Sequence, residues 1–196
     1  MFNPRRLREQ ILPDPPACSL VRVTVDGKLT GHVFACRWKQ NGRRVCWVTQ
    51  MVVHRDYRER GLASCLLRSL RLDADDDVYG IMSSHPAACM TAASAFAVGI
   101  EKVSLEFIRE NAEEVIRTSP IPYVREAELH GSIFEPGDSS GLVCGVDTRF
   151  FVDHREPVET LRRARETKEW PLGVLPEGHE YLLVLPGKQR RLKGST

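Results

Sequence analysis

The sequence predicts a mixed α/β domain, and three observations point to this class. Two segments that alternate apolar and polar residues are separated by hairpin turn signals. A run that is apolar on both faces follows, and a tight turn joins it to an amphipathic helix. A second short apolar run and a second helix complete a β-α-β-α order. This order implies that two of the strands are parallel neighbours in one sheet.

Length and composition limit the chain to one main core. The chain has 196 residues, of which 42% are hydrophobic, so we expect a single domain over residues 18–186. Residues 1–17 are rich in arginine and proline and are expected to form a tail or linker, and residues 187–196 a basic C-terminal tail. The formal net charge of +2 gives no reason to expect a nucleic-acid or membrane partner.

The six cysteines are scattered singly, mostly among apolar neighbours. The first ten residues lack the apolar run of a secretory signal, and no stretch approaches the roughly 20 apolar residues that span a bilayer. We therefore expect reduced, buried thiols in a soluble, cytoplasmic protein.

The first strands are predicted by alternation and by turn residues. Residues 18–25 alternate with period two, and Asp26-Gly27 predicts a hairpin turn. Residues 29–38 are then the returning strand, and Asn41-Gly42 is a second turn signal. The run at 45–53 is β-branched and aromatic, which is typical of a central strand covered on both faces.

Helices and further strands follow in order. The leucines between Leu62 and Leu70 give one apolar helical face, residues 78–84 predict a strand, and Pro86 can begin the second helix. Residues 104–118 predict an amphipathic helix. The last elements expected are a strand over the alternating residues 142–152, a charged helix from Glu156 to about Trp170, and a strand at 181–185.

The most informative segment is the turn Arg58-x-x-Gly61-x-Ala63 between the central strand and the first helix. Backbone N–H groups at a helix N-terminus are unpaired and lie at the positive end of the helix dipole, so this turn suits an anionic phosphate. Gly61 and Ala63 are small enough for a pyrophosphate to approach the main chain. The simpler interpretation is a surface turn whose arginines serve solubility.

The block from Val48 to Leu67, VTQMVVHRDYRERGLASCLL, resembles motif A of the GNAT acetyltransferase family. The resemblance implies a mixed, mostly antiparallel sheet with a central splayed parallel strand pair, flanking helices, and acetyl-CoA as cofactor. It implies that the main chain of Met51, Val52 and Val53 lines the pantetheine arm. The implied pyrophosphate site consists of Arg58, Glu59, Arg60, Gly61, Leu62, Ala63 and Ser64.

The sequence departs from this family at the proton-transfer groups. Many members have a glutamate on the central strand and a tyrosine on the second helix, but residues 45–53 contain no glutamate and the tyrosine position is Phe96. The best substitute base is His85, at the expected carboxyl end of a parallel strand, although it can also cap the helix or face solvent. Weaker candidates are Tyr57, Gln50, His54 and Tyr123.

No metal site is expected, because His85 and Cys89 are the only finger-like pair and have no second pair. The family usually begins with helices that wall the acceptor pocket. Here that wall is short, and the helices at 104–118 and 156–170 are candidates to replace it.

Two functions remain open from the sequence. The first is an N-acyltransferase that acts on a small primary amine or a protein amine. The second is a non-catalytic CoA-binding or interaction module on the same scaffold, and turnover would separate the two.

Overall fold

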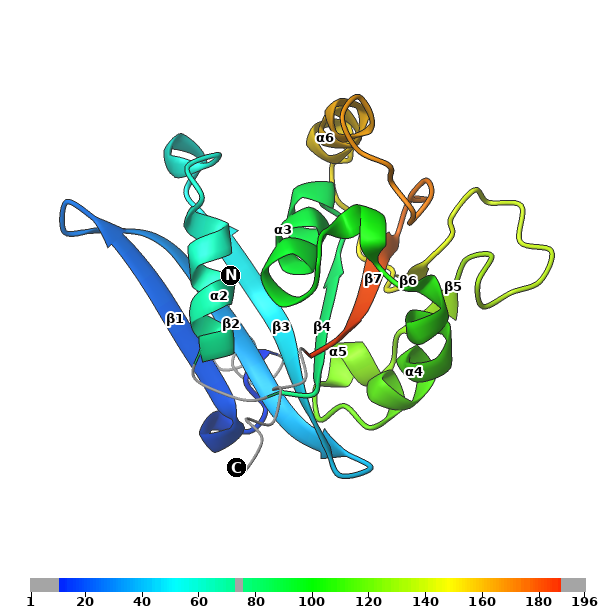
Figure 1. The fold of residues 1–196 in the computed structure, drawn as a ribbon, viewed down its shortest axis with the longest axis horizontal. Helices are drawn as coiled ribbons and strands as arrows, with labels where there is room; N and C mark the ends of the chain where they lie inside the picture. Colours follow the sequence, from blue (N-terminus) through cyan, green and yellow to red (C-terminus); the bar gives the residue numbers. More distant parts are fainter. Residues whose placement is uncertain (1–10, 73–75, 188–196) are drawn as a thin grey trace, which may run out of the picture.

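A computed structural model describes residues 11–72 and 76–187. Its centre is one seven-stranded sheet in the order β1-β2-β3-β4-β7-β6-β5 (Figure 1). The strands are β1 (Cys18–Val25), β2 (Lys28–Gln40), β3 (Arg43–Val53), β4 (Val78–Ser83), β5 (Glu128–His130), β6 (Gly145–Asp147) and β7 (His179–Pro186).

The sheet contains one parallel pair among antiparallel neighbours. β3 and β4 run parallel, whereas the pairs β1–β2, β2–β3, β4–β7, β7–β6 and β6–β5 are antiparallel. This confirms the mixed, mostly antiparallel sheet with a central parallel pair.

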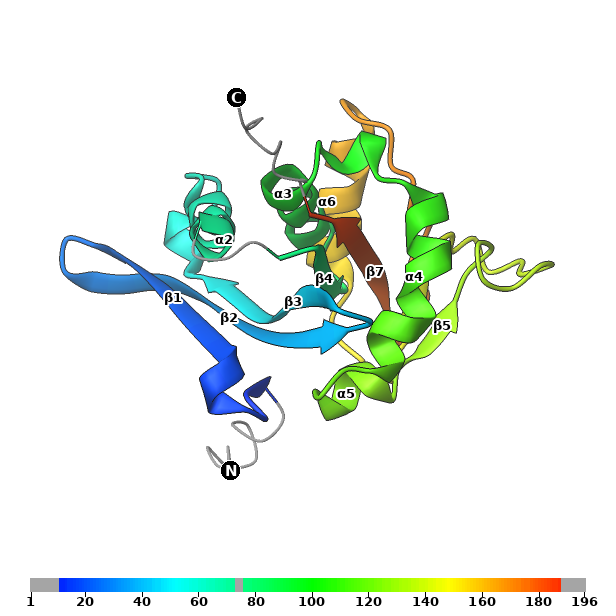
Figure 2. The ribbon, with the colours of Figure 1, turned by 60° about the horizontal axis from the view of Figure 1, so that its bottom comes forward.

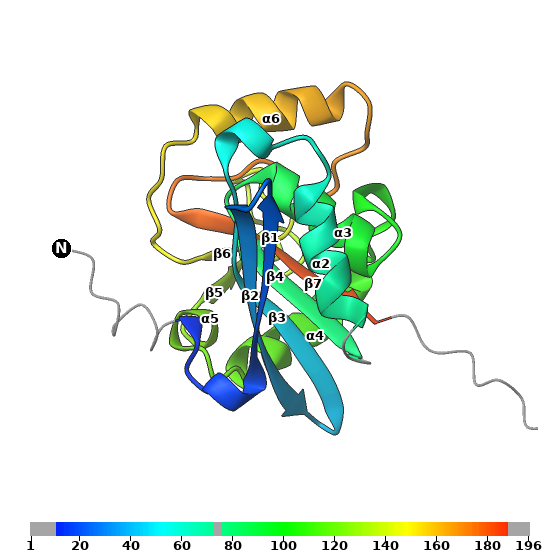
Figure 3. The ribbon, with the colours of Figure 1, turned by 90° about the vertical axis from the view of Figure 1, so that its left-hand side faces the viewer.

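The helices cover both faces of the sheet. Helix α2 (Leu62–Leu72) and helix α3 (Pro86–Phe96) lie on one face, and α4 (Leu105–Arg117) and α5 (Pro122–Arg125) on the other. Figure 2 shows α2 and α3 above the sheet and α5 below it. Helix α6 (Arg155–Arg165) lies across the end of the sheet, beside the turn that follows β3 (Figure 3).

Side chains of the central strands fix which face each helix covers. Arg37 on β2 donates to the Leu70 carbonyl of α2, and Tyr79 on β4 stacks on Phe96 of α3 at 4.2 Å between ring centroids. On the opposite face the Trp38 indole donates to Thr118 at the end of α4. The buried Trp47 side chain lies on that same face, against Gly80, where an added Cβ would be 2.0 Å from its ring. Glycine is therefore required at position 80.

Most predicted elements are confirmed to within two residues at each end, but two are much shorter than expected. The expected strand at 142–152 is limited to β6, because Arg149 adopts a φ of +53° and only residues 145–147 have strands on both sides. The expected helix to Trp170 ends at Arg165, because its buried side chains, Pro157, Leu161 and Ala164, end there. The Trp170 side chain instead packs on Tyr181.

Two short elements, α5 and β5, were not expected from the sequence. Each has at most four residues, which is too short for a periodic pattern to register.

The expectation that all six thiols are reduced is wrong for one pair. Cys18 and Cys36 are joined by a disulfide between the facing positions of β1 and β2. Cys46, Cys89 and Cys144 are free and buried, as expected, and burial raises the pKa of the Cys46 thiol to about 12. Cys65 is free but exposed.

The terminal predictions fall largely outside the described residues. Residues 1–10 and 188–196 lie outside them, and residues 15–17 of the expected tail form a short 3₁₀ helix, η1 (Pro15–Ala17). Within the described ranges, none of the helices has the length and apolar character needed to cross a bilayer.

Candidate active site

The turn after β3 carries two residues in the left-handed region. His54 caps a short 3₁₀ helix, η2 (Arg55–Tyr57), and Arg58 then returns to extended backbone. Glu59 has a φ of +60° and Gly61 a φ of +76°, and α2 begins at Leu62. Turns that place residues in the left-handed region can leave backbone N–H groups free to contact an anion.

Gly61 leaves the space in front of this turn open. A Cβ built on Gly61 would meet no atom within 4 Å, and the Gly61 carbonyl accepts from Cys65, so the helix begins immediately after it. The first N–H groups of α2 therefore lie at the positive end of the helix dipole. An anion can approach the main chain here without a side chain in its path.

Two side-chain contacts hold Arg58 at the edge of this turn. Its Nε donates to the Val53 carbonyl at 3.3 Å, and its guanidinium pairs with Glu156 at the start of α6. A cavity of about 540 Å³ opens beside the pair, lined by Arg55, Arg58, Glu59 and Glu156. The cavity thus combines two arginines with a carboxylate that belongs to a distant part of the chain.

Glu156 is paired with the Arg58 guanidinium, which is a positive charge that a bound phosphate would contact. Replacing Glu156 by glutamine is expected to strengthen CoA binding about two- to fivefold, since an exposed ion pair is worth roughly 0.5–1 kcal/mol. Isothermal titration of both proteins with CoA measures this change. The matched control is Glu159→Gln on the same helix, whose partners are Arg162 and Arg163. Equal affinities in all three proteins would contradict competition at Arg58.

The parallel pair separates at the end nearest this turn. β3 pairs with β4 from Val45 opposite Val78 only as far as Val48 opposite Ile81. Residues Met51, Val52 and Val53 continue to pair with β2 on their other side. Within the described chain, their edge toward β4 has no strand partner, so it offers main-chain groups to a ligand. This is the splay that the resemblance implies.

A β-bulge marks the point of separation. The β2 register shifts between Phe34 and Ala35, so Thr49 of β3 is left without a facing residue. The Tyr123 hydroxyl of α5 donates to the Thr49 carbonyl at 3.2 Å. The Thr49 Oγ1 is buried and forms no hydrogen bond with the described part of the protein. A buried hydroxyl of this kind needs a partner, which a bound ligand can supply.

Glu180 is a carboxylate that interacts electrostatically with Tyr123, the residue that contacts the bulge. Tyr181 pairs with Ser83 at the end of β4, so Glu180 lies one residue further along β7. Its side chain is on the face that carries α5. Burial raises the pKa of Tyr123, and the charge of Glu180 raises it further. Burial also raises the pKa of Glu180, and contact with Thr148 partly offsets this. A carboxyl group with a raised pKa is suited to proton exchange near neutral pH.

The two predicted catalytic residues lie on the cofactor side. The His85 Nδ1 accepts from the Ala87 N–H at 3.2 Å as the cap of α3, and its Nε2 lies 3.5 Å from Glu156. With Nδ1 accepting, neutral His85 carries its proton on Nε2 and has no free lone pair to act as a base. Tyr57 has its ring under the Arg60 guanidinium, at 5.2 Å.

The other candidates have structural partners. Gln50 contacts His32 at 3.2 Å. Phe96 is buried against Tyr79, so a nonpolar ring lies at the position where many GNAT proteins have a tyrosine. Among the candidates from the sequence, Tyr123 and Gln50 lie at the bulge, and Tyr123 contacts the Thr49 carbonyl. Glu180, Thr49 and Glu156 were missed, because only the sheet order and the position of α6 bring them to the site.

The described chain thus places a splayed parallel strand pair beside the turn that begins α2. Residues 2–97 match the family model described as Acetyltransferase (GNAT) family. This region makes up just under half of the chain, and it is similar to the GNAT acetyltransferases. No curated protein sequence matches the chain.

Several solved structures share parts of the fold. A ribosomal-protein-alanine N-acetyltransferase from Brucella melitensis is 29% identical over 37% of this chain and 54% of its own, with a TM-score of 0.31. An aminoglycoside acetyltransferase from an uncultured soil sample is 9% identical over 37% of this chain and 48% of its own, with a TM-score of 0.31. A GNAT-family protein from Bacteroides thetaiotaomicron is 11% identical over 85% and 80%, with a TM-score of 0.34. The chain thus spans about half the length of the first two.

The residues present fit an acetyl-CoA molecule. The open space at Gly61 and the two arginines of the cavity suit the pyrophosphate. The unpaired edge of Met51–Val53 suits the amide groups of the arm, and the buried Thr49 hydroxyl lies where the separated strands would enclose the thioester.

Proposed function

We propose that this chain is an acetyl-CoA-dependent N-acyltransferase that transfers an acetyl group directly to an amine. The observation that supports this most strongly is the position of the turn Arg58–Ser64 at the mouth of the splayed β3–β4 pair. A phosphate held at the N-terminus of α2 directs the attached arm between the two strands.

The chain's own residues would position the reacting groups and accept the amine proton. Acetyl-CoA, when bound, supplies the activated acetyl group as a thioester. The amine nitrogen would form the new bond to the carbonyl carbon while the carbon–sulfur bond breaks. The thiolate would leave as CoA, and the amine proton would pass to the Glu180 carboxylate. Tyr123 fixes the bulge carbonyl of Thr49 from the same side. Positioning of this kind contributes most of the rate in direct transfer.

The acceptor is proposed to be a small primary amine or a protein amine, which approaches from the α5 face. We propose neither a nucleic-acid nor a membrane partner, and we assign no oligomeric state. The cytoplasm remains the proposed location, supported by three buried free thiols. The Cys18–Cys36 disulfide argues against a cytoplasmic location, because disulfides are rare in the cytosol.

A non-catalytic CoA-binding module is the second candidate function. The observation that favours it is Phe96, which is 1% exposed and stacked on Tyr79, so the second helix offers no hydroxyl to protonate a leaving thiolate. In this case the turn and the splay would bind CoA, and no amine would be acetylated.

Calorimetric titration with acetyl-CoA, beside adenosine diphosphate, tests the cofactor site. Saturation near one molecule per chain, much tighter than for the nucleotide, is the expected result. Thiol release with a panel of amines then tests turnover. Binding without release for any amine would favour the module, and absence of binding would contradict both functions.

His85→Ala separates a capping role from a base role. Because His85 Nδ1 caps α3, we expect the variant to lose about 0.5–2 kcal/mol of stability and to keep the pH profile of turnover. His85→Asn can cap and should restore much of the stability. Chemical unfolding and the pH dependence of kcat/KM measure the two effects. If an ionisation disappears from the pH profile of kcat/KM in both variants, the result would support His85 as the base.

A further inference from the structure

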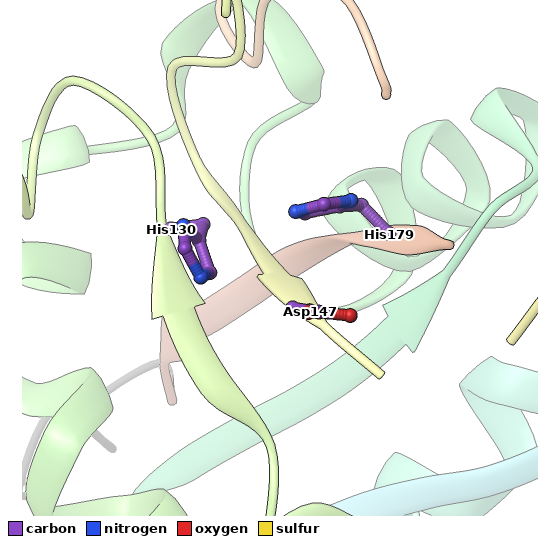
Figure 4. Close-up of side chains that lie close together, drawn as sticks. All are labelled: His130, Asp147 and His179. Carbon is purple, nitrogen blue, oxygen red and sulfur yellow. The ribbon is translucent and has the colours of Figure 1, made fainter. Parts of the chain in front are cut away.

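Three potential metal ligands meet on one face of the outer sheet, away from the cofactor turn. His130 on β5, Asp147 on β6 and His179 on β7 place one nitrogen or carboxylate oxygen each within 4.8 Å of one another (Figure 4). The two imidazole rings are perpendicular in an edge contact, with centroids 5.3 Å apart. Two histidines and one carboxylate form a ligand set that zinc and other divalent transition metals use.

The strand register brings these residues together. Asp147 faces His179 directly across β6 and β7, and His130 faces Gly145 across β5 and β6. Gly145 has no side chain, so no side chain at that position of β6 separates His130 from the Asp147–His179 pair. The three residues are far apart in the sequence, which explains why their spacing gave no metal signal and why no metal was expected.

Each of the three side chains has its second polar atom held by another group. His130 Nδ1 donates to Glu135 at 2.9 Å, and His179 Nδ1 donates to the Glu177 carbonyl at 2.8 Å. Asp147 Oδ1 accepts from the Arg149 N–H at 2.9 Å. Partners of this kind orient metal-binding histidines and carboxylates and select the tautomer that leaves Nε2 free. Both Nε2 atoms and Asp147 Oδ2 are therefore available to a cation.

The local charge also favours a cation. The Glu135 carboxylate contacts His130, and Asp138 lies within electrostatic reach of both His130 and His179. Together with Asp147, these two carboxylates add negative charge close to the two imidazoles.

We propose that His130, Asp147 and His179 bind one divalent transition metal ion, with zinc as the preferred ion. Bonds of about 2.0–2.2 Å require ligand atoms roughly 3.3–3.5 Å apart, which small rotations of the three side chains achieve. The fourth position of the tetrahedron is open to water. The bound ion links the three outer strands β5, β6 and β7, so it stabilises the edge of the sheet that lies next to Glu180.

The test uses Co²⁺ and Zn²⁺ on the full chain after treatment with a chelator. Co²⁺ is expected to bind at one equivalent, with the strong visible absorption of a four-coordinate site. His179→Gln and Asp147→Asn are expected to weaken Co²⁺ binding by at least tenfold. The matched control is His54→Ala, because His54 also lies near an aspartate, with its Nδ1 3.8 Å from Asp56, but has no third ligand within the described chain.

Thermal unfolding gives a second measurement that does not require the variants to fold. Free Zn²⁺ at about 100 times its Kd is expected to raise the Tm of the wild type by roughly 5–10 °C. No visible band and no Tm shift in the wild type would overturn the site. Binding that is lost equally in His54→Ala, or retained in both ligand variants, would also overturn it.

Discussion

Gly61→Glu is expected to abolish CoA binding, with a loss of affinity of at least 100-fold. Gly61 has a φ of +76°, and the space before it is open, so the new carboxylate would project into the region proposed for the pyrophosphate. Repulsion between two anions at the N-terminus of a helix then replaces the favourable dipole interaction. Calorimetric titration with CoA measures the loss.

Gly42→Glu is the matched control for this substitution. Gly42 has a φ of +81° and also has open space around its Cβ position, but it lies in the β2–β3 hairpin at the opposite end of β3. Both variants therefore carry the same added charge and a similar backbone strain. Near-normal affinity in Gly61→Glu, or an equal loss in Gly42→Glu, would count against the turn as the phosphate site.

Glu180→Gln is expected to lower kcat by about 100-fold or more, the usual range for loss of a positioned base. Its effect on CoA affinity should be small, because Glu180 lies on the opposite face from α2. The wild-type kcat/KM should rise with pH as the Glu180 carboxyl ionises at its raised pKa, and this limb should be absent from the variant. Steady-state kinetics across pH with any active amine measures both effects.

Stability distinguishes a catalytic from a structural role for Glu180. Burial raises its folded-state pKa above the ordinary value of about 4.5, so the folded state binds the proton more tightly. The resulting stabilisation is present below about pH 4.5 and is lost as the pH rises through the raised pKa. At neutral pH, Glu180→Gln should therefore have a Tm at or above that of the wild type.

Glu126→Gln, which changes an exposed carboxylate just after α5, is the control for Glu180→Gln and should leave kcat and Tm unchanged. A lower Tm with unchanged kcat in Glu180→Gln would show that Glu180 serves the fold alone.

The parts of the fold that local sequence determines could be predicted. The strands β1 to β4 and the helices α2 to α4 follow from apolar periodicity and turn residues within each segment. The phosphate turn was also local, because Arg58, Gly61 and Ala63 lie within one continuous stretch. The outer strands could not be predicted in the same way, since β5 and β6 have three residues each.

The cysteine pair shows why contacts between segments need the structure. A simple hairpin at Asp26-Gly27 pairs Val25 with Lys28, and in that register Cys18 would face Ala35. A bulge between Val23 and Thr24 shifts the register by one residue and brings Cys36 opposite Cys18. The sequence contains no signal for this bulge that alternation can reveal, and the same holds for the bulge at Thr49.

The position of α6 has a consequence for how this protein can diverge. The arginines of the phosphate cavity come from the region that matches the GNAT family model, whereas Glu156 comes from beyond residue 97. The apparent affinity for a ligand falls in proportion to the fraction of molecules that are competent to bind it. If the proposed function holds, substitutions in a segment outside the matched region can therefore tune the acetyl-CoA concentration at which the protein works. Homologues with an identical phosphate turn can then differ in their response to the cell's acetyl-CoA supply.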